Sequence, residues 1–96
     1  MRVEKDIDVT DRVAIELQDR ETEYGYVIAY IRPMQELTDG ELLEYYGIDY
    51  HSEEYQSLKQ PHKMPKLVIR RENTQTNFVI PQGLWAKCLR VMEDEE

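Results

Sequence analysis

The stretch from Tyr24 to Ile31 constrains the fold of this chain more than any other. It is rich in aromatic and β-branched residues, which favour a pleated strand. Both of its faces are apolar, and this indicates a central strand that is covered on two sides. Pro33 then ends the strand, because proline has no N–H to donate to a sheet ladder. The two sets expected on opposite faces are Tyr26, Ile28 and Tyr30, and Val27, Ala29 and Ile31.

The residues before this strand predict its hairpin partner. Val13, Ile15 and Leu17 alternate with polar or small residues over 12–18, and a period of two is typical of a half-buried strand. The polar stretch 19–23 separates the two runs, so we expect a β-hairpin over 12–31. Residues 1–11 are rich in charge, and we expect them to form an N-terminal arm or a short edge strand.

The next element is a helix with clear ends. Thr38 and Glu41 form a capping box, in which each side chain satisfies the backbone N–H of the other residue. Gly47 stands where a left-handed residue closes a helix, so the expected helix spans 39–46. Two apolar contacts are expected to secure its ends: Leu37 with Leu42, and Ile48 with Leu43.

The second half repeats the order of elements. Ser52 is expected to cap a short helix over 53–59, and Pro61 and Pro65 favour an extended connector after it. A second hairpin is expected from strands 66–71 and 76–80. A last helix over 82–92 follows, and 93–96 form an acidic tail that we expect to fray. The apolar stripe of this helix consists of Leu84, Trp85, Cys88, Leu89 and Met92, with Trp85 as an anchor of the core.

These elements predict one small α+β domain over residues 1–96. Its fold class is a four-stranded antiparallel sheet made of two hairpins, with two or three helices in the order ββα-(α)-ββα. Helices on one face of that sheet bury both apolar stripes.

Charge and composition narrow the classes of function. The net charge of −8, from 20 acidic and 12 basic residues, repels nucleic acid and anionic membranes, so neither is an expected partner. The single cysteine, Cys88, excludes an internal disulfide and favours a reducing, cytoplasmic location. The first residues start no apolar run, and no stretch has the length of a membrane span.

The sequence gives catalysis little support. Cys88 lies in an apolar stripe without a base or a cation beside it in sequence, which is typical of an inert thiol. No spacing of acids and histidines matches a metal motif, and glycine-rich phosphate loops are absent. We therefore expect no enzyme, no cofactor and no metal. The residues that come nearest to a metal-binding set are Asp49, His51, Glu53, Glu54 and His62. The sequence assigns no role to the two histidines.

Charge is divided along the chain. Every charged residue from Glu36 to Glu54 is acidic, and every one from Lys59 to Arg71 is basic. Tyr45, Tyr46, Tyr50 and Tyr55 are interleaved with the acids, a composition that suits interfaces. Two interpretations stay open, because the rings also suit a core and the acids a solvated helix face.

Our leading hypothesis is a non-catalytic interaction or regulatory domain. It binds a protein with a basic surface, or a second copy of itself, through the acidic segment 36–55. One alternative is an acidic nucleic-acid mimic that inhibits a nucleic-acid enzyme. Another is a weak nucleic-acid binder that uses the basic second hairpin, with Lys66, Arg70 and Arg71. The expected partner-binding residues are Glu41, Glu44, Tyr46, Asp49, Tyr50, Glu53, Glu54 and Tyr55.

Overall fold

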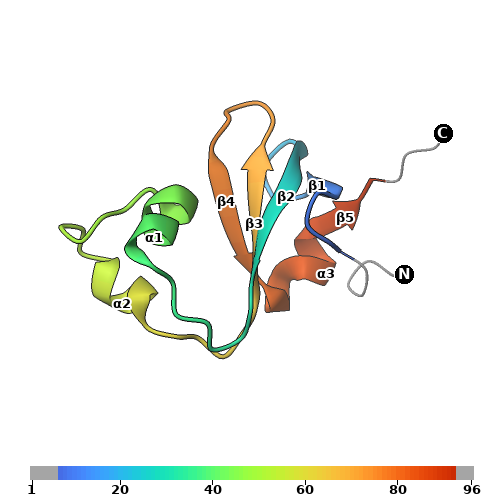
Figure 1. The fold of residues 1–96 in the computed structure, drawn as a ribbon. Helices are drawn as coiled ribbons and strands as arrows, with labels where there is room; N and C mark the ends of the chain where they lie inside the picture. Colours follow the sequence, from blue (N-terminus) through green and yellow to red (C-terminus); the bar gives the residue numbers. More distant parts are fainter. Residues whose placement is uncertain (1–6, 93–96) are drawn as a thin grey trace.

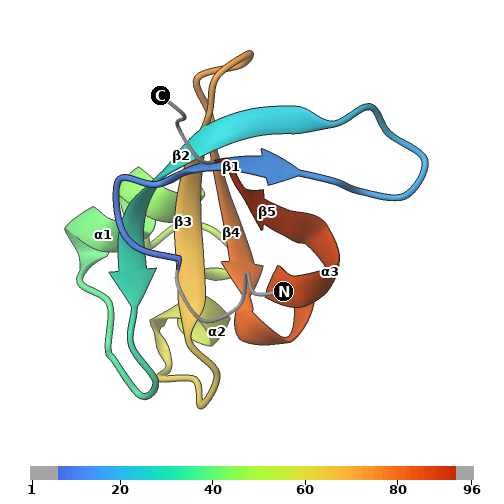
Figure 2. The same ribbon diagram turned by 90° about the vertical axis from the view of Figure 1, so that its right-hand side faces the viewer.

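The computed structural model describes residues 7–92 and shows an α+β fold built on a five-stranded antiparallel sheet. The strand order is β4-β3-β2-β1-β5, so the last strand pairs with the first (Figures 1 and 2). The elements are β1 (Arg12–Ile15), β2 (Glu23–Ile31), α1 (Asp39–Tyr46), α2 (Tyr55–Lys59), β3 (Lys66–Arg71), β4 (Asn77–Pro81), the 3-10 helix η2 (Gln82–Leu84), α3 (Trp85–Cys88) and β5 (Leu89–Val91).

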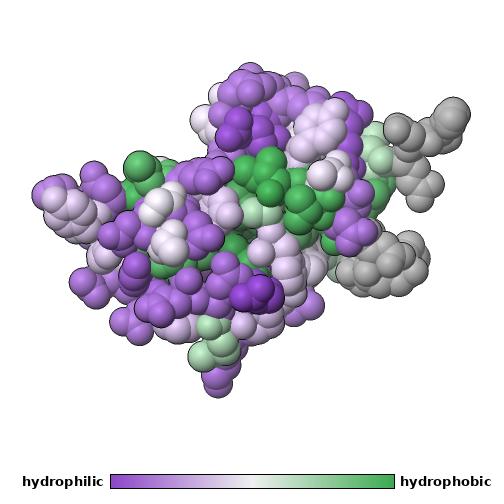
Figure 3. Space-filling model, viewed as in Figure 1, coloured by the Kyte–Doolittle hydropathy of each residue, from purple (hydrophilic) through white to green (hydrophobic). Residues whose placement is uncertain are grey.

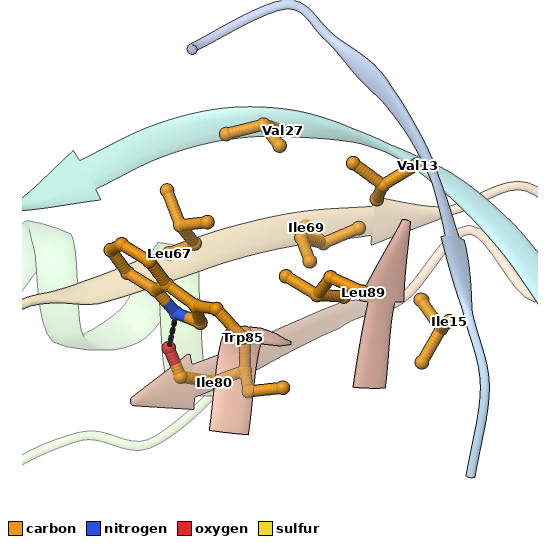
Figure 4. Packing of buried hydrophobic residues seen from close by; sticks show 8 residues of the cluster. All are labelled: Val13, Ile15, Val27, Leu67, Ile69, Ile80, Trp85 and Leu89. Carbon is orange, nitrogen blue, oxygen red and sulfur yellow. Dashed lines mark hydrogen bonds between the residues drawn. The ribbon is translucent and has the colours of Figure 1, made fainter. Parts of the chain in front are cut away.

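The sheet separates two apolar cores. Along β3, Leu67 and Ile69 enter one core, whereas Val68 enters the other. The main core is Val13, Ile15, Val27, Leu67, Ile69, Ile80, Trp85 and Leu89 (Figure 4). The helix-side core is Ile31, Leu37, Leu42 and Val68, covered by α1 and α2. The predicted α+β class and antiparallel hairpins are confirmed. The prediction of helices on one face is wrong, because Trp85 of α3 packs in the main core and Leu42 of α1 in the helix-side core.

A bulge in β2 changes which side chains share a face. Val27 pairs with Ile69, but the next pair along the ladder is Ala29 with Val68, so Ile28 is an extra residue. Val27 therefore lies in the main core, whereas Ala29 and Ile31 lie with the helix-side core. The prediction that Val27, Ala29 and Ile31 share one face is wrong for this reason.

The first hairpin forms between the two predicted runs, although β1 ends at Ile15 rather than at residue 18, and the first helix has its predicted bounds. β1 pairs with β2 from Arg12↔Tyr26 to Ile15↔Glu23. In α1, the Thr38 hydroxyl accepts from the Glu41 N–H at 3.1 Å, and the Glu41 carboxylate accepts from the Thr38 N–H at 2.9 Å. Gly47 closes the helix in the left-handed conformation with φ 71°.

α2 begins later than predicted. It spans Tyr55–Lys59, and Glu54, which precedes it, makes no capping bond through its side chain. The Ser52 hydroxyl instead accepts from the Asp49 N–H at 3.3 Å and stabilises a turn in the preceding loop. The expected start at residue 53 is therefore wrong. The hairpin of β3 and β4 matches its prediction, with Leu67 opposite Ile80 and Ile69 opposite Phe78.

The predicted helix over 82–92 is wrong. The chain makes η2 and the short α3, then becomes extended at Leu89 and pairs with β1 as β5. Leu89 lies opposite Ile15, and Val91 lies opposite Val13. Without β5, the second edge of β1 would have unpaired N–H and C=O groups, and β5 satisfies them. This is the fifth strand that the sequence did not predict.

The predictions for the two ends of the chain are only partly covered. Residues 7–11 contain a turn and no strand. Of the two alternatives expected over 1–11, an arm or an edge strand, the edge strand is therefore not formed by residues 7–11. Residues 1–6 and the predicted tail 93–96 lie outside the described residues.

Candidate interaction surface

The acidic segment, residues 36–55, comprises the three residues before α1, α1 itself, the loop after it and the first residue of α2. It covers the helix-side core, away from β1, β5 and α3 (Figure 1). Hydrophilic residues dominate the surface over α1, α2 and the loop between them, whereas apolar surface gathers over the sheet (Figure 3). The segment therefore lies on a predominantly hydrophilic part of the surface.

Three of its four tyrosines are turned inward. Tyr45, Tyr46 and Tyr55 are partly buried and pack against the helix-side core. Burial raises the pKa of Tyr46, and burial together with the charges of Glu41 and Glu44 raises the pKa of Tyr45. Of the expected partner-binding residues, Tyr46 and Tyr55 thus contribute mainly to packing.

Tyr50 is the exception, because 68% of its surface is exposed. Its ring stacks on His51 with centroids 4.1 Å apart and an angle of 33° between the planes. The backbone of this turn is held by a hydrogen bond from the His51 N–H to the Asp49 carboxylate at 3.0 Å. The loop therefore presents an aromatic pair to solvent on an ordered turn.

Carboxylates surround this pair in the sequence and are exposed in the structure. The exposed members of the expected set are Glu44, Asp49, Glu53 and Glu54. Glu41 is partly buried, and its carboxylate belongs to the capping box. Leu43, which the sequence analysis assigned to packing, is 58% exposed and adds an apolar side chain to this surface.

Asp39 is not among these available acids. Its carboxylate accepts from the Tyr55 hydroxyl at 2.8 Å and from the Lys59 ammonium at 3.1 Å. These bonds, first that of Tyr55 and then that of Lys59, hold the pKa of Asp39 below its ordinary value. The network joins α2 to the first turn of α1.

The two arginines of the second hairpin, Arg70 and Arg71, are bonded within the fold. Arg70 donates to the Asn77 side chain at 2.8 Å, and the Asn77 amide donates to the Glu44 carbonyl at 2.6 Å. Arg71 bonds the Thr76 hydroxyl at 2.7 Å and lies 3.7 Å from the Glu23 carboxylate. These contacts leave the guanidinium groups less available to a phosphate backbone.

A third group of residues comes together only in the fold. The Lys66 ammonium lies 3.3 Å from Nδ1 of His62 and 3.5 Å from the Tyr46 hydroxyl. These residues line a small hollow between α1, the end of β2 and the connector before β3. Lys66 and His62 are four positions apart in sequence, but only the fold brings Tyr46 to them.

Other candidate sites receive no support from the geometry. Among residues 7–92, no three His, Cys, Asp or Glu side chains are placed to hold a metal ion. Cys88 is half-buried and packs against the main core. None of the helices within residues 7–92 has the length and apolar composition that a membrane span requires. Comparison with protein-family models, curated proteins and solved structures found no match to this chain.

Proposed function

We propose that this protein is a non-catalytic interaction domain that binds a basic protein surface through its acidic segment. The observation that carries the proposal is the exposed Tyr50 ring, stacked on His51 in a loop with exposed carboxylates. Tyrosine is enriched among residues that dominate binding energy, because it offers a large apolar area and a polar tip. An exposed ring on an ordered turn is available for such a contact without reorganisation.

Charge supports a basic partner. Glu44, Asp49, Glu53 and Glu54 are exposed and belong to a segment without a cationic residue of its own. A surface of one sign attracts the opposite sign over about 10 Å at ordinary salt. The exposed Leu43 adds apolar area that a partner can bury.

The contacts of the cationic side chains favour the acidic segment over the second hairpin as the binding surface. Arg71 lies beside Glu23, Arg70 is bonded to Asn77, and the Lys66 ammonium faces His62 and Tyr46. A nucleic-acid binder needs cations that are free to meet phosphates. The acidic segment offers charges with fewer internal partners.

The test begins with capture of a partner from the native cell on the immobilised full chain, followed by identification by mass spectrometry. Association and dissociation rates are then measured with the purified partner. Tyr50→Ala is expected to speed dissociation at least about tenfold, as the loss of an anchor residue does. Tyr26→Ala is the matched control, because Tyr26 is also exposed (46%) but lies on β2.

Charge reversal separates the electrostatic contribution. Glu53→Lys is expected to slow association and to weaken its salt dependence, since charges at the rim act mainly on the on-rate. Glu21→Lys, in the exposed loop between β1 and β2, is the control. If the Tyr26 and Glu21 variants lose binding while the Tyr50 and Glu53 variants bind normally, the proposal is wrong. Competition of nucleic acid for the same partner would instead indicate the mimic.

A further inference from the structure

β4 is one edge of the sheet, and half of its backbone polar groups point away from β3 (Figure 1). In an antiparallel pair, residues that exchange hydrogen bonds alternate with residues whose N–H and C=O point outward. At one end of the pairing, the Arg71 N–H donates to the Thr76 carbonyl at 2.9 Å. At the other end, the Gln82 N–H donates to the Pro65 carbonyl at 2.9 Å. Counting inward from both ends, the outward residues are Asn77, Val79 and Pro81.

These outward groups are available to another chain. Among residues 7–92, the backbone N–H and C=O groups of Asn77 and Val79 have no hydrogen-bond partner. Both residues are only partly buried, so the edge is accessible. Pro81 has no N–H to donate and limits the pairing at its end. β4 therefore offers two N–H donors with their neighbouring carbonyls to a further strand.

β5, the other edge of the sheet, is protected from such pairing. It has only three residues, and Arg90 among them is exposed and pairs with Glu16. A short edge strand that carries charge discourages the addition of another strand. β4 has five residues, and none of them is charged. Of the two edges, β4 is therefore the one that suits a partner strand.

A groove beside β4 indicates which side chains an added strand needs on the helix side of the sheet. It has a volume of about 400 Å³ and lies between the end of α1, with Glu44 and Tyr45, and the β3–β4 hairpin, with Asn77. Glu44 is exposed, and α1 has no basic residue in its last turn to offset the negative end of the helix dipole. Arg70 also lines the groove, but its guanidinium donates to the Asn77 side chain at 2.8 Å. The α1 wall of the groove therefore matches a Lys or Arg side chain.

The other face of β4 suits an apolar side chain. Phe78 is partly buried and packs against the main core, and the Arg71 guanidinium lies 5.7 Å from the centre of its ring. Side chains that lie directly opposite each other on neighbouring strands are about 5 Å apart, so a residue beside Phe78 would contact the ring. Apolar surface also gathers over this part of the sheet (Figure 3). The matching strand thus alternates basic and apolar residues.

We propose that β4 receives an extended segment of a basic partner as a further strand, with Lys or Arg side chains on the α1 side and apolar side chains on the Phe78 side. The backbone of the segment bonds Asn77 and Val79, and a basic side chain lies in the groove against Glu44. In this mode of recognition the backbone provides affinity and alternate side chains provide specificity. The inference rests on the proposed function for the basic character of the partner, but its contacts lie at β4 and not at Tyr50.

The test uses a synthetic peptide of alternating lysine and valine, about six residues long with blocked ends, added to the full chain. Amide hydrogen exchange measured by NMR is the readout. Exchange at Asn77 and Val79 is expected to slow at least about fivefold at saturating peptide, and exchange at Val91 of β5 is expected not to change. Unchanged exchange at Asn77 and Val79 at millimolar peptide overturns the proposal.

Two control peptides separate backbone pairing from charge. The same sequence with methylated backbone nitrogens cannot donate to β4, so it is expected to give no slowing. A peptide of alternating glutamate and valine is expected to bind more weakly, because Glu44 repels it. If the methylated peptide protects Asn77 and Val79 as well as the parent peptide does, strand addition is wrong. If the glutamate peptide binds as tightly as the lysine peptide, the basic character of the partner segment is wrong.

Val79→Pro tests the edge from the side of the protein. It removes an outward N–H without removing a bond between β3 and β4, and it is expected to weaken the lysine peptide at least about tenfold. Val91→Pro is the matched control, because the bonds of β5 to β1 on either side of Val91 leave its N–H pointing outward too. Equal affinity of Val79→Pro and the parent overturns the proposal. Where Val79→Pro fails to fold, the methylated peptide decides the question on the unaltered protein.

Glu44→Gln tests the groove. It is expected to weaken the lysine peptide about two- to fivefold, as the loss of an exposed ion pair does, whereas Glu21→Gln in the loop between β1 and β2 is expected to have no effect. If exchange at Asn77 and Val79 slows with protein concentration alone and sedimentation shows a dimer, a second copy occupies the edge and the basic partner segment is wrong. The peptide does not need Tyr50, so Tyr50→Ala leaves its binding unchanged, and the two proposals can fail separately.

Discussion

The indole N–H of Trp85 donates to the backbone carbonyl of Ile80 at 2.9 Å, and both residues are buried in the main core (Figure 4). This bond fixes α3 against the end of β4 and sets the point from which β5 returns to β1. A buried indole that keeps its polar group bonded avoids the cost of an unpaired donor.

Trp85 should therefore be the most sensitive position in the C-terminal part of the chain. Trp85→Ala removes a side chain that is only 7% exposed and is expected to lower the free energy of unfolding by about 3–5 kcal/mol. Trp85→Phe keeps much of the apolar contact and loses the hydrogen bond, so a smaller loss of about 1–2 kcal/mol is expected. Urea denaturation measures both values. Two variants of parental stability would show that Trp85 is not an anchor of the core.

Gly25 should not tolerate a side chain. A Cβ atom there would lie 2.6 Å from the Arg70 carbonyl oxygen and 2.7 Å from Cγ2 of Ile69, so β2 and β3 would have to separate. We expect Gly25→Ala to cost about 1–3 kcal/mol, as other overpacked positions do. Gly40→Ala is the matched control in α1, where the nearest atom lies at 3.9 Å and alanine favours the helix. In thermal melts, Gly25→Ala should have a lower Tm than the parent, whereas Gly40→Ala should have a Tm equal to or higher than that of the parent. The reverse order would contradict the close approach of β2 and β3 at Gly25.

The capping box should contribute measurably to stability. Thr38→Ala removes the hydroxyl that accepts from the Glu41 N–H, and we expect a loss of about 1 kcal/mol. Thr22→Ala, at an exposed loop position, controls for the loss of a threonine side chain. Circular dichroism melts of the two variants should differ. If they coincide, the box does not stabilise α1.

The Asp39 network predicts a dependence of stability on acid. The folded-state pKa of Asp39 is lowered by its bonds from Tyr55 and Lys59, so its carboxylate stabilises the fold above the unfolded-state pKa. This contribution is lost as the pH falls through the folded pKa, below about 4. Asp39→Asn should thus lower the Tm at neutral pH, and the gap from the parent should narrow toward roughly pH 2.

Asp19→Asn, in the exposed loop before β2, controls for the loss of one negative charge. Melting curves from neutral to acidic pH make the comparison. A gap between Asp39→Asn and the parent that is as large in acid as at neutral pH would exclude the network as its source.

Local signals explain what could be predicted from the sequence. α1 was correctly bounded because its cap, its left-handed Gly47 and the contact of Leu37 with Leu42 all lie within a few residues. The prediction of a C-terminal helix was wrong because the apolar spacing of residues 82–92 is also compatible with a short helix followed by a strand. The chain forms a strand at Leu89 because it pairs there with the free edge of β1, which is far away in sequence. Nothing in the sequence of β2 marked the bulge at Ile28.

The candidate surface shows the same limit. The run of acids was visible in the sequence, but which tyrosine faces solvent depends on the packing of α1 and α2 on the sheet. Tyr46 and Tyr50 are four residues apart and have similar sequence surroundings, yet one packs on the core and the other is exposed. The group of Lys66, His62 and Tyr46 requires the same packing, so only the structure reveals it.

The pairing of β5 with β1 has a consequence for synthesis on the ribosome. The β1–β2 hairpin emerges early, but Ile15 finds its partner Leu89 only when nearly all of the described chain has been translated. Until then the edge of β1 and one side of the main core have no cover, and exposed strand edges promote aggregation. Closing so long a loop costs entropy that local contacts do not offset, which slows folding. Docking of β5 is therefore expected to be a late step in folding.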